Sequence, residues 1–337
     1  MAILASEFPL VFVLITVIVV VSGIWFLRYN LLCLIVGSLS ILLFLSPVLR
    51  AGLAAAKIQS MFKSENTYPF NLLSMITGSG TAPVMPQYFT YNKKEKLTLS
   101  FNKAESKKLQ PCVIAIHGGA WHGGNNDELP ELNELLAEDG YHVASINYRL
   151  APAFRFPAAI EDVECAIRYL KLHATELKID TNRFVLMGRS AGAQIALLTA
   201  YTTKQAGIKG VIDFYGPADM VWGYSAPANP WVLNSRKIME DYLGGTFKQI
   251  PNVYNRSSPL FYASKKSVPT LIIHGKNDVL VSYEHSIRLH EKLNRLGVKN
   301  FFVSLPWATH GFDYNINGPG GQLSTFAVKR FLEIVCK

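Results

Sequence analysis

A serine in the middle of the chain stands in a context that suits nucleophilic catalysis. Ser190 is the central residue of Gly188-Arg189-Ser190-Ala191-Gly192, which follows the apolar run 184–187 and precedes a stretch of small residues. Small residues on both sides let the chain turn sharply from a strand into a helix and present the hydroxyl. A serine hydroxyl is a weak nucleophile by itself, so this chemistry also needs a base and a group that orients the base. The pattern predicts acyl transfer through a covalent intermediate.

Candidates for the base and its orienting acid follow the serine along the chain. His310 lies in a loop after the predicted strand 301–304, and Asp278 follows the apolar strand that ends near His274. The chain order is then nucleophile, acid, base, one of the orders that triads of this kind use. Asp219, at the end of another predicted strand, is a second candidate for orienting the base.

Two adjacent glycines supply a candidate site for the negative charge of the reaction. Gly118 and Gly119 follow the apolar strand 112–117. Their backbone N–H groups, together with that of Ala191, could bind a developing oxyanion. An ordinary glycine-rich turn is the alternative interpretation. Three apolar rings are candidates for lining a substrate pocket: Trp121, Trp222 and Phe312. For any one of them taken singly, packing in the core is the more ordinary role.

The elements that would position these residues alternate between strands and helices. Two strands, 86–91 and 96–101, are predicted first, and strand–helix pairs then repeat to the end of the chain. A leading hairpin followed by such pairs predicts an α/β fold, with a mostly parallel central sheet flanked by helices. Residues 222–267 interrupt the alternation and are long for a simple connection. We therefore expect a cap or lid over the site there.

The N-terminal segment is predicted to lie in a membrane. Residues 8–27 and 29–49 carry no charge, and each run is close to the ~20 residues that span a hydrocarbon core as a helix. The favoured interpretation is a transmembrane hairpin over residues 1–50, turned at Arg28-Tyr29-Asn30. A juxtamembrane helix and linker would follow over 51–83, and a catalytic domain over 84–337. A single tilted helix with a re-entrant segment is the alternative, and a cleaved signal peptide fits less well because the first seven residues hold no Lys or Arg.

Composition and charge limit the possible partners. The 337 residues are 50% hydrophobic with a net charge of +9, which excludes a disordered chain. The four cysteines form no paired motif, so neither a metal site nor a disulfide framework is expected. No basic motif with interleaved aromatic residues indicates nucleic acid. The expected partners are a small-molecule or lipid ester and the membrane lipid around residues 8–49. Arg50, Lys57 and Lys63, against Arg28 in the turn, slightly favour a cytoplasmic catalytic domain.

Together these motifs give the chain a family resemblance. Residues from about 84 to 336 resemble the hormone-sensitive-lipase-like branch of the α/β-hydrolase superfamily, which includes bacterial carboxylesterases. The motifs that carry the resemblance are His117-Gly118-Gly119, Tyr148-Arg149-Leu150-Ala151-Pro152, Gly188-Arg189-Ser190-Ala191-Gly192, Gly275-Lys276-Asn277-Asp278 and His310-Gly311-Phe312.

The resemblance implies a Ser190–His310–Asp278 triad, with Gly118, Gly119 and Ala191 as oxyanion donors, and no cofactor. Two positions depart from the family pattern and blur the substrate subfamily. Ala120 stands where a third glycine is frequent, and Ala193 stands where the nucleophile motif frequently ends in glycine. The leading hypothesis is a membrane-anchored serine carboxylesterase or lipase. An amide or peptide hydrolase on the same triad and a non-catalytic, membrane-tethered binding protein are the alternatives; neither the oligomeric state nor the alcohol of the ester follows from the sequence.

Overall fold

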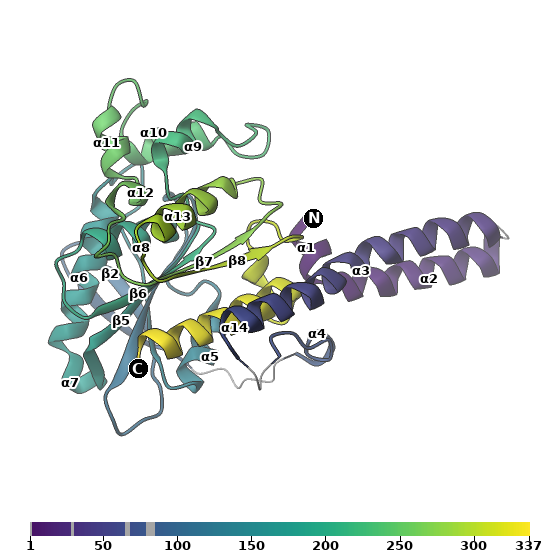
Figure 1. Cartoon of the computed structure of the whole chain (residues 1–337), viewed down its shortest axis with the longest axis horizontal. Helices are drawn as coiled ribbons and strands as arrows, with labels where there is room; N and C mark the ends of the chain where they lie inside the picture. The colour runs from purple at the N-terminus through teal and green to yellow at the C-terminus, as the bar shows by residue number, and fades with distance from the viewer. Residues whose placement is uncertain (1, 28–29, 65–67, 79–84) are drawn as a thin grey trace. The chain divides into compact units, whose positions relative to one another are not determined.

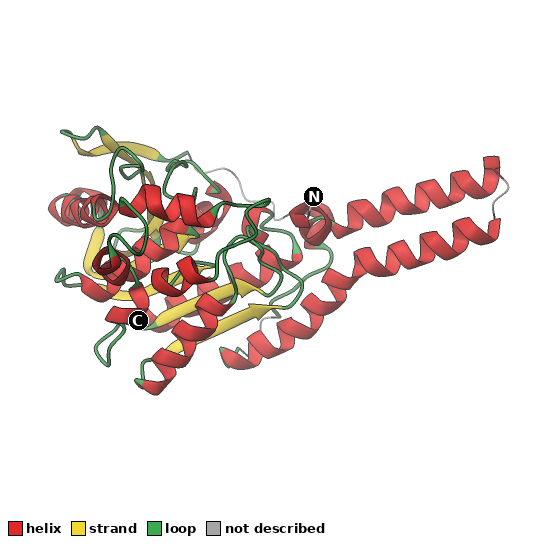
Figure 2. Cartoon of the chain, turned by 90° about the horizontal axis from the view of Figure 1, so that it is seen from above, coloured by secondary structure: helices red, strands yellow, loops and turns green. Residues whose placement is uncertain are grey.

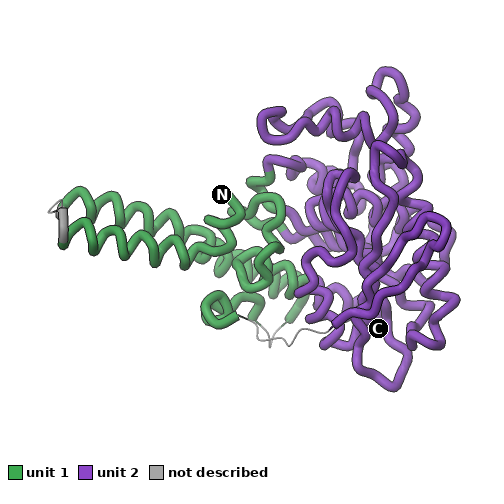
Figure 3. Tube along the Cα trace, turned by 180° about the vertical axis from the view of Figure 1, so that it is seen from behind, with its two compact units in different colours: residues 1–80, 275–278, 304–327 green, residues 81–274, 279–303, 328–337 purple. Residues whose placement is uncertain are grey.

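The computed structural model describes residues 2–27, 30–64, 68–78 and 85–337 (Figure 1). The chain divides into two compact units that do not follow the order of the sequence (Figure 3). The first unit holds Met1–Gly80 with Gly275–Asp278 and Ser304–Ala327. The second holds Thr81–His274, Val279–Val303 and Val328–Lys337. Two short segments from late in the chain thus pack with its N-terminal part.

One eight-stranded sheet forms the centre of the fold, with the strand order β1-β2-β4-β3-β5-β6-β7-β8. The first two strands pair antiparallel, as does β2 with β4, whereas β4, β3, β5, β6 and β7 pair in parallel. The predicted hairpin and mostly parallel sheet are confirmed. The strands are β1 Gln87–Asn92, β2 Leu97–Asn102, β3 Gln110–Ile116, β4 His142–Ile146, β5 Ile179–Arg189, β6 Ile208–Phe214, β7 Thr270–Gly275 and β8 Asn300–Leu305.

Helices flank this sheet because the parallel strands are apolar on both faces. Every residue of Pro111–Ile116 in β3 is buried, as is every residue of β7. Helix α8 packs against β5 and β6, and its small side chains bring the helix close to the strands. The helices that accompany the sheet are α5 Pro130–Glu138, α6 Ala158–Leu172, α7 Ala174–Leu177, α8 Ala191–Thr202, α13 Glu284–Arg295 and α14 Pro319–Val335.

The predicted insertion between β6 and β7 is largely helical. It contains α9 Met220–Ser225, α10 Ser235–Leu243, α11 Pro251–Arg256 and α12 Pro259–Tyr262. Asp219 begins it, because its carboxylate accepts a hydrogen bond from the Trp222 N–H at 2.9 Å and caps α9. The division of the chain at residues 50 and 83, and the cap limits 222–267, stay predictions.

The N-terminal segment forms the short helix α1, Ala2–Glu7, and two long helices that lie side by side in opposite directions (Figure 2). These are α2, Pro9–Leu27, and α3, Asn30–Met61, and a short α4, Ser74–Thr77, follows. The Phe12 and Phe44 rings stack across the pair at 5.1 Å. Residues 28–29 of the predicted turn lie outside the described residues.

Helix α3 is continuous across Arg50, so the predicted second span and the start of the predicted juxtamembrane helix form one element. Its part Leu31–Met61 is long and apolar enough to cross a membrane, by length and composition. Pro9–Trp25 in α2 forms a shorter apolar helix.

Candidate active site

Ser190 occupies a sharp turn between β5 and α8. Its φ of 53° and ψ of −119° place a non-glycine residue in a sparsely populated backbone conformation. Such strain persists only where the surroundings hold it, and it is concentrated at functional sites. The Ser190 N–H donates to the Phe214 carbonyl at 2.9 Å and thereby ties the turn to the end of β6.

The glycines on both sides of Ser190 are required by close backbone packing. A Cβ on Gly188 would lie 2.2 Å from the carbonyl oxygen of Gly192. A Cβ on Gly192 would lie 2.2 Å from the carbonyl oxygen of Ile116, at the end of β3. The Gly-x-Ser-x-Gly spacing therefore reflects the approach of α8 to two neighbouring strands.

The second glycine motif borders the same serine. A Cβ on Gly118 would lie 3.5 Å from the Ser190 Cβ. The backbone then turns through three successive left-handed residues, Gly119, Ala120 and Trp121, with φ of 100°, 53° and 61°. This loop thus runs directly beside the nucleophile candidate in a conformation that only a tightly held chain adopts.

Tyr148 explains part of how the glycine loop is held. Its hydroxyl donates to the carbonyl oxygens of His117 and Gly118 at 3.2 and 3.3 Å, and its ring stacks on the His117 ring at 4.3 Å. Burial lowers the pKa of His117 to about 4. His117 is therefore neutral near pH 7, and its Nδ1 lies 2.8 Å from the Gly118 carbonyl oxygen within the same turn.

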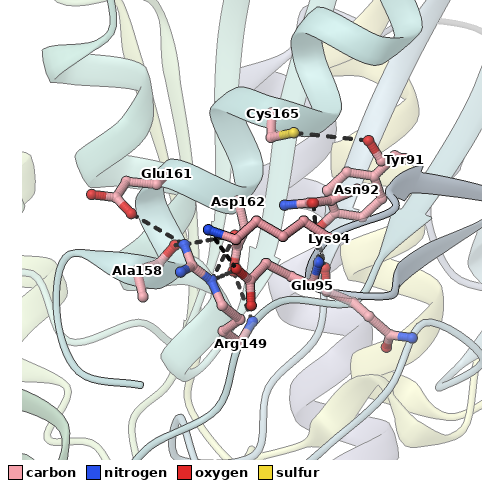
Figure 4. Close-up of polar contacts among 10 residues, drawn as sticks. Tyr91, Asn92, Lys94, Glu95, Arg149, Ala158, Glu161, Asp162 and Cys165 are labelled. Atoms are coloured by element: carbon pink, nitrogen blue, oxygen red, sulfur yellow. Dashed lines mark hydrogen bonds and ion pairs between the residues drawn. The ribbon is translucent and has the colours of Figure 1, made fainter. Parts of the chain in front are cut away.

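The neighbouring Arg149 fixes the loop that carries Tyr148 (Figure 4). Its Nε donates to both carboxylate oxygens of Asp162 at 2.9 and 3.0 Å, and its backbone N–H donates to the same group at 2.8 Å. Burial raises the pKa of Asp162, and the hydrogen bonds from Arg149 oppose that rise. Two residues later, the Ala151 N–H donates to the carbonyl of Trp121 at 2.9 Å. This loop therefore supports the turn at Gly119–Trp121.

Ser190 lines a cavity of about 570 Å³, a volume that includes the cavity mouth. The wall is mostly apolar and comes from the glycine loop, the start of α8, the helical insertion and the loop before α13. Ser190 itself, Ser235, Ser282 and His285 bring polar side chains to it. The lining residues are Ala120, Trp121, Ser190, Ala191, Pro217, Gly223, Ala226, Ala228, Leu233, Ser235, Ile238, Met239, Leu280, Val281, Ser282 and His285.

Of the three side chains expected at a substrate pocket, Trp121 lines this cavity. Trp222 and Phe312 are not among the described residues that line it. The Trp222 ring meets the His285 ring edge-on at 4.9 Å and lies under the Arg288 guanidinium at 4.7 Å. Phe312 is completely buried in a short 3₁₀ helix, η1, Phe312–Tyr314.

The base and acid candidates form a pair in the first unit. His310 Nδ1 lies 2.7 Å from Asp278 Oδ2, and the Asp278 side chain is inaccessible to solvent. A carboxylate at Nδ1 holds the ring orientation and leaves Nε2 for proton transfer. Asp219, the second candidate for this role, caps α9 and lies 3.6 Å from Arg288. Ser190 belongs to the second unit.

Two residues that support the cavity were not identified from the sequence. Gln194, fully buried in α8, accepts a hydrogen bond from Trp121 Nε1 at 3.0 Å and donates to the Ser257 carbonyl at 2.7 Å. Tyr242 from α10 stacks on Trp121 with ring centroids 4.5 Å apart. The one signal in the sequence was a polar glutamine inside a helix of small apolar residues. Within the described residues, no group of three His, Cys, Asp or Glu side chains could hold a metal ion.

The mostly parallel sheet, the strand–Ser190–helix turn and the helical insertion define an α/β hydrolase. An esterase structure from Pyrobaculum calidifontis aligns with a TM-score of 0.65 and 21% identity, covering 86% of this chain and 99% of that one. The BD-FAE family model matches residues 97–293, and the chain belongs to this family.

Curated relatives carry esterase names. Esterase LipC of Mycobacterium tuberculosis is 27% identical over 245 residues, which cover 68% of this chain and 59% of LipC. Ethyl acetate hydrolase of Pseudomonas putida is 27% identical over 213 residues, which cover 60% of this chain and 65% of that protein. The chain thus spans somewhat less than two thirds of the length of these relatives.

Proposed function

We propose that this protein is a membrane-anchored serine hydrolase that cleaves carboxylic esters. In this mechanism His310 Nε2 takes the proton of the Ser190 hydroxyl as the oxygen attacks the ester carbonyl. The N–H groups of Gly118, Gly119 and Ala191 bind the oxyanion. His310 then returns the proton to the departing alcohol, and water, activated by the same histidine, releases the acid from the acyl-enzyme. Asp278 holds the imidazole and stabilises its charged form.

The observation that carries this proposal is the position of Ser190, on a strained left-handed turn at the wall of an apolar cavity. The hydroxyl stands at the N-terminus of α8, where backbone dipoles favour negative charge. Gly118 borders the serine closely. The paired His310 and Asp278 supply the remaining two groups that nucleophilic catalysis requires.

The cavity wall supports an ester with an apolar acyl or alcohol part. Leu233, Ile238, Met239 and Leu280 offer aliphatic surface, and Trp121 offers an aromatic ring. Cavities of a few hundred Å³ with few polar groups suit small apolar ligands. The esterase names of the relatives point to the same substrate class.

We place the membrane anchor in α2 and α3, with residues 1–50 as the hairpin, 51–83 as the juxtamembrane part and 84–337 as the catalytic domain. The length and apolar composition of Leu31–Met61 support this assignment. The basic residues Arg50, Lys57 and Lys63 support a cytoplasmic catalytic domain. The full chain should then remain in membranes after alkaline carbonate washing and be released by detergent; release by carbonate alone would contradict the anchor.

The catalytic part is tested with the detergent-solubilised full chain. p-Nitrophenyl esters with acyl chains of two to sixteen carbons are compared with p-nitroanilides for wild type and Ser190→Ala. We expect ester hydrolysis that falls by at least about 10⁴-fold in Ser190→Ala. Ser264→Ala, on an exposed loop, is the matched serine control and should retain full activity.

A fluorophosphonate label gives an independent readout, because it reacts with an activated serine. It should modify wild type and Ser264→Ala, but not Ser190→Ala. Ester hydrolysis that survives in Ser190→Ala would refute the nucleophile assignment. Cleavage of anilides alone would replace the ester by an amide, and a folded wild type that neither turns over esters nor takes the label would indicate a binding protein.

A further inference from the structure

An entirely buried carboxyl group lies two residues before the first long apolar helix, α2. Glu7 ends α1 and has no solvent exposure. Its Oε2 accepts a hydrogen bond from the Gly320 N–H at 2.7 Å, and its backbone oxygen accepts one from Asn315 Nδ2 at 2.7 Å. Glu7, Asn315 and Gly320 all belong to the first unit. A carboxyl group at the start of a membrane segment is thus enclosed by protein.

Glycines line the site in which the Glu7 side chain is buried. A Cβ on Gly318 would lie 2.7 Å from both the backbone oxygen and Oε2 of Glu7, and a Cβ on Gly320 would lie 3.1 Å from both carboxyl oxygens. A Cβ on Gly311 would come within 3.3 Å of Ile3 Cδ1, one turn earlier in α1. The glycine-rich sequence 318–321, at the start of α14, therefore has a specific partner, because larger side chains at 318 and 320 would meet Glu7.

The same contacts hold the segment that follows His310. Asn315 and Gly320, which come after the histidine, hydrogen-bond to Glu7, and α1 packs against η1, which lies between His310 and Asn315. His310 and Asp278 belong to the same unit. The N-terminal helix and the base of the proposed triad therefore form one packed body.

We propose that Glu7 is a positioning residue for His310, so that helix α1 completes the half of the active site that carries the base. This inference rests on the proposed function, in which His310 acts on Ser190. The hydrogen bond to Asp278 fixes the rotation of the imidazole, and the contacts of Glu7 fix the loop that places it. A misplacement of about 1 Å in a catalytic group can cost on the order of 10²-fold in rate.

The carboxyl group works in its neutral form. Burial raises the pKa of Glu7 to about 8, while the Gly320 N–H and the Trp307 and Ser6 side chains act in the opposite direction. Asp313 in η1 is the charged group whose field acts on it, and its negative charge raises the pKa further. Above about pH 8 the buried group ionises, and its desolvation cost disfavours the packed loop.

The test uses the full chain in detergent, with kcat and KM measured on a short-chain p-nitrophenyl ester from pH 6 to pH 10. Glu7→Ala removes the contact and should lower kcat about 10- to 100-fold at unchanged KM, because the substrate cavity is built from the second unit. Glu7→Gln keeps the volume and an acceptor for Gly320, so it should restore most of kcat. Leu4→Ala changes a half-exposed side chain of the same helix and should match wild type.

The pH profile separates positioning from a general structural role. Wild-type kcat should fall above about pH 8 as Glu7 ionises, whereas Glu7→Gln, which cannot ionise, should keep its plateau. If kcat of wild type and of Glu7→Gln changes in the same way above pH 8, the inference is overturned. This comparison does not need Glu7→Ala, so it holds even when that variant fails to fold. An unchanged kcat in Glu7→Ala, or an equal loss in Leu4→Ala, would overturn it too. Ser190→Ala keeps the two proposals apart: if it is inactive while Glu7→Ala is fully active, only the role of Glu7 fails.

Discussion

Gly192 offers a sharp test of how Ser190, the proposed nucleophile, is positioned. It is the second residue of α8, and a Cβ at this position would lie 2.2 Å from the Ile116 oxygen and 2.3 Å from the His117 oxygen. These are backbone atoms at the end of a central strand, so they cannot rotate away as the tip of a long side chain can. In Gly192→Ala the start of α8, together with Ser190, must move.

The size of the movement follows from these distances. A carbon–oxygen contact is relaxed at about 3.3 Å, so α8 has to retreat by about 1 Å from β3. Overpacking of this kind costs about 1–3 kcal/mol of stability, which corresponds to about 2–4 °C in Tm for each kcal/mol in a domain of this size. Displacement of the nucleophile by that distance should lower kcat on the order of 10²-fold.

Gly123→Ala is the matched control, because a Cβ there would meet nothing within 4 Å and the backbone does not need a left-handed residue. Thermal unfolding and ester kinetics of both variants in detergent, beside wild type, make the comparison. We expect Gly123→Ala to match wild type in both. A Gly192→Ala protein with wild-type kcat and Tm would refute the argument that the second glycine of the motif is required by contact with β3.

Three further predictions follow from individual side chains. Asp162→Ala leaves Arg149 without its buried partner and should cost about 3 kcal/mol, whereas Glu161→Ala, whose carboxylate is 62% exposed, should cost less than about 1 kcal/mol; equal Tm losses would contradict this. The pKa of Glu7 is raised from 4.5 to about 8 in the folded chain, so the folded state holds a proton that the unfolded chain has released between these values. Stability therefore falls as the pH rises through that window, by up to about 1.4 kcal/mol per pH unit, and the Tm of wild type should drop relative to Glu7→Gln from pH 5 to pH 8; parallel Tm curves would refute the burial argument. Met239→Phe adds volume to the cavity wall and should shift the preferred p-nitrophenyl ester to a shorter acyl chain, with unchanged fluorophosphonate labelling; an unshifted preference would place the acyl chain elsewhere.

Local patterns predicted the sheet and the strand-to-helix turn at Ser190 well. The leading hairpin, the parallel strands and the helical insertion all follow from hydrophobic periodicity and from the spacing of glycines. Ser190 stands at its turn because glycines at 188 and 192 allow the backbone to pack closely there. These features depend on a few neighbouring residues, which a sequence displays directly.

The supports of the site could not be predicted in the same way. In the sequence, Gln194 is only a polar residue in an apolar helix. The structure shows that its side-chain oxygen accepts hydrogen bonds from Trp121 and Tyr242, whose rings stack on each other. Asp278, the favoured acid, and Asp219, the second candidate, each follow a strand in the sequence. In the structure Asp278 meets His310, whereas Asp219 caps a helix. The choice depends on which loops come together, and chain spacing does not encode that.

The sequence by itself determined the chemistry available to this protein and the order of the elements that carry it, because motifs and periodicity are local properties of the chain. Tertiary structure alone decided that Glu7, a residue at the edge of an apolar segment, is buried against the loop of His310. It also decided that residues 304–327 pack with the N-terminal helices. Such contacts join residues about 300 positions apart. They exist because the Glu7 carboxyl group meets Gly318 and Gly320 only after the chain has folded.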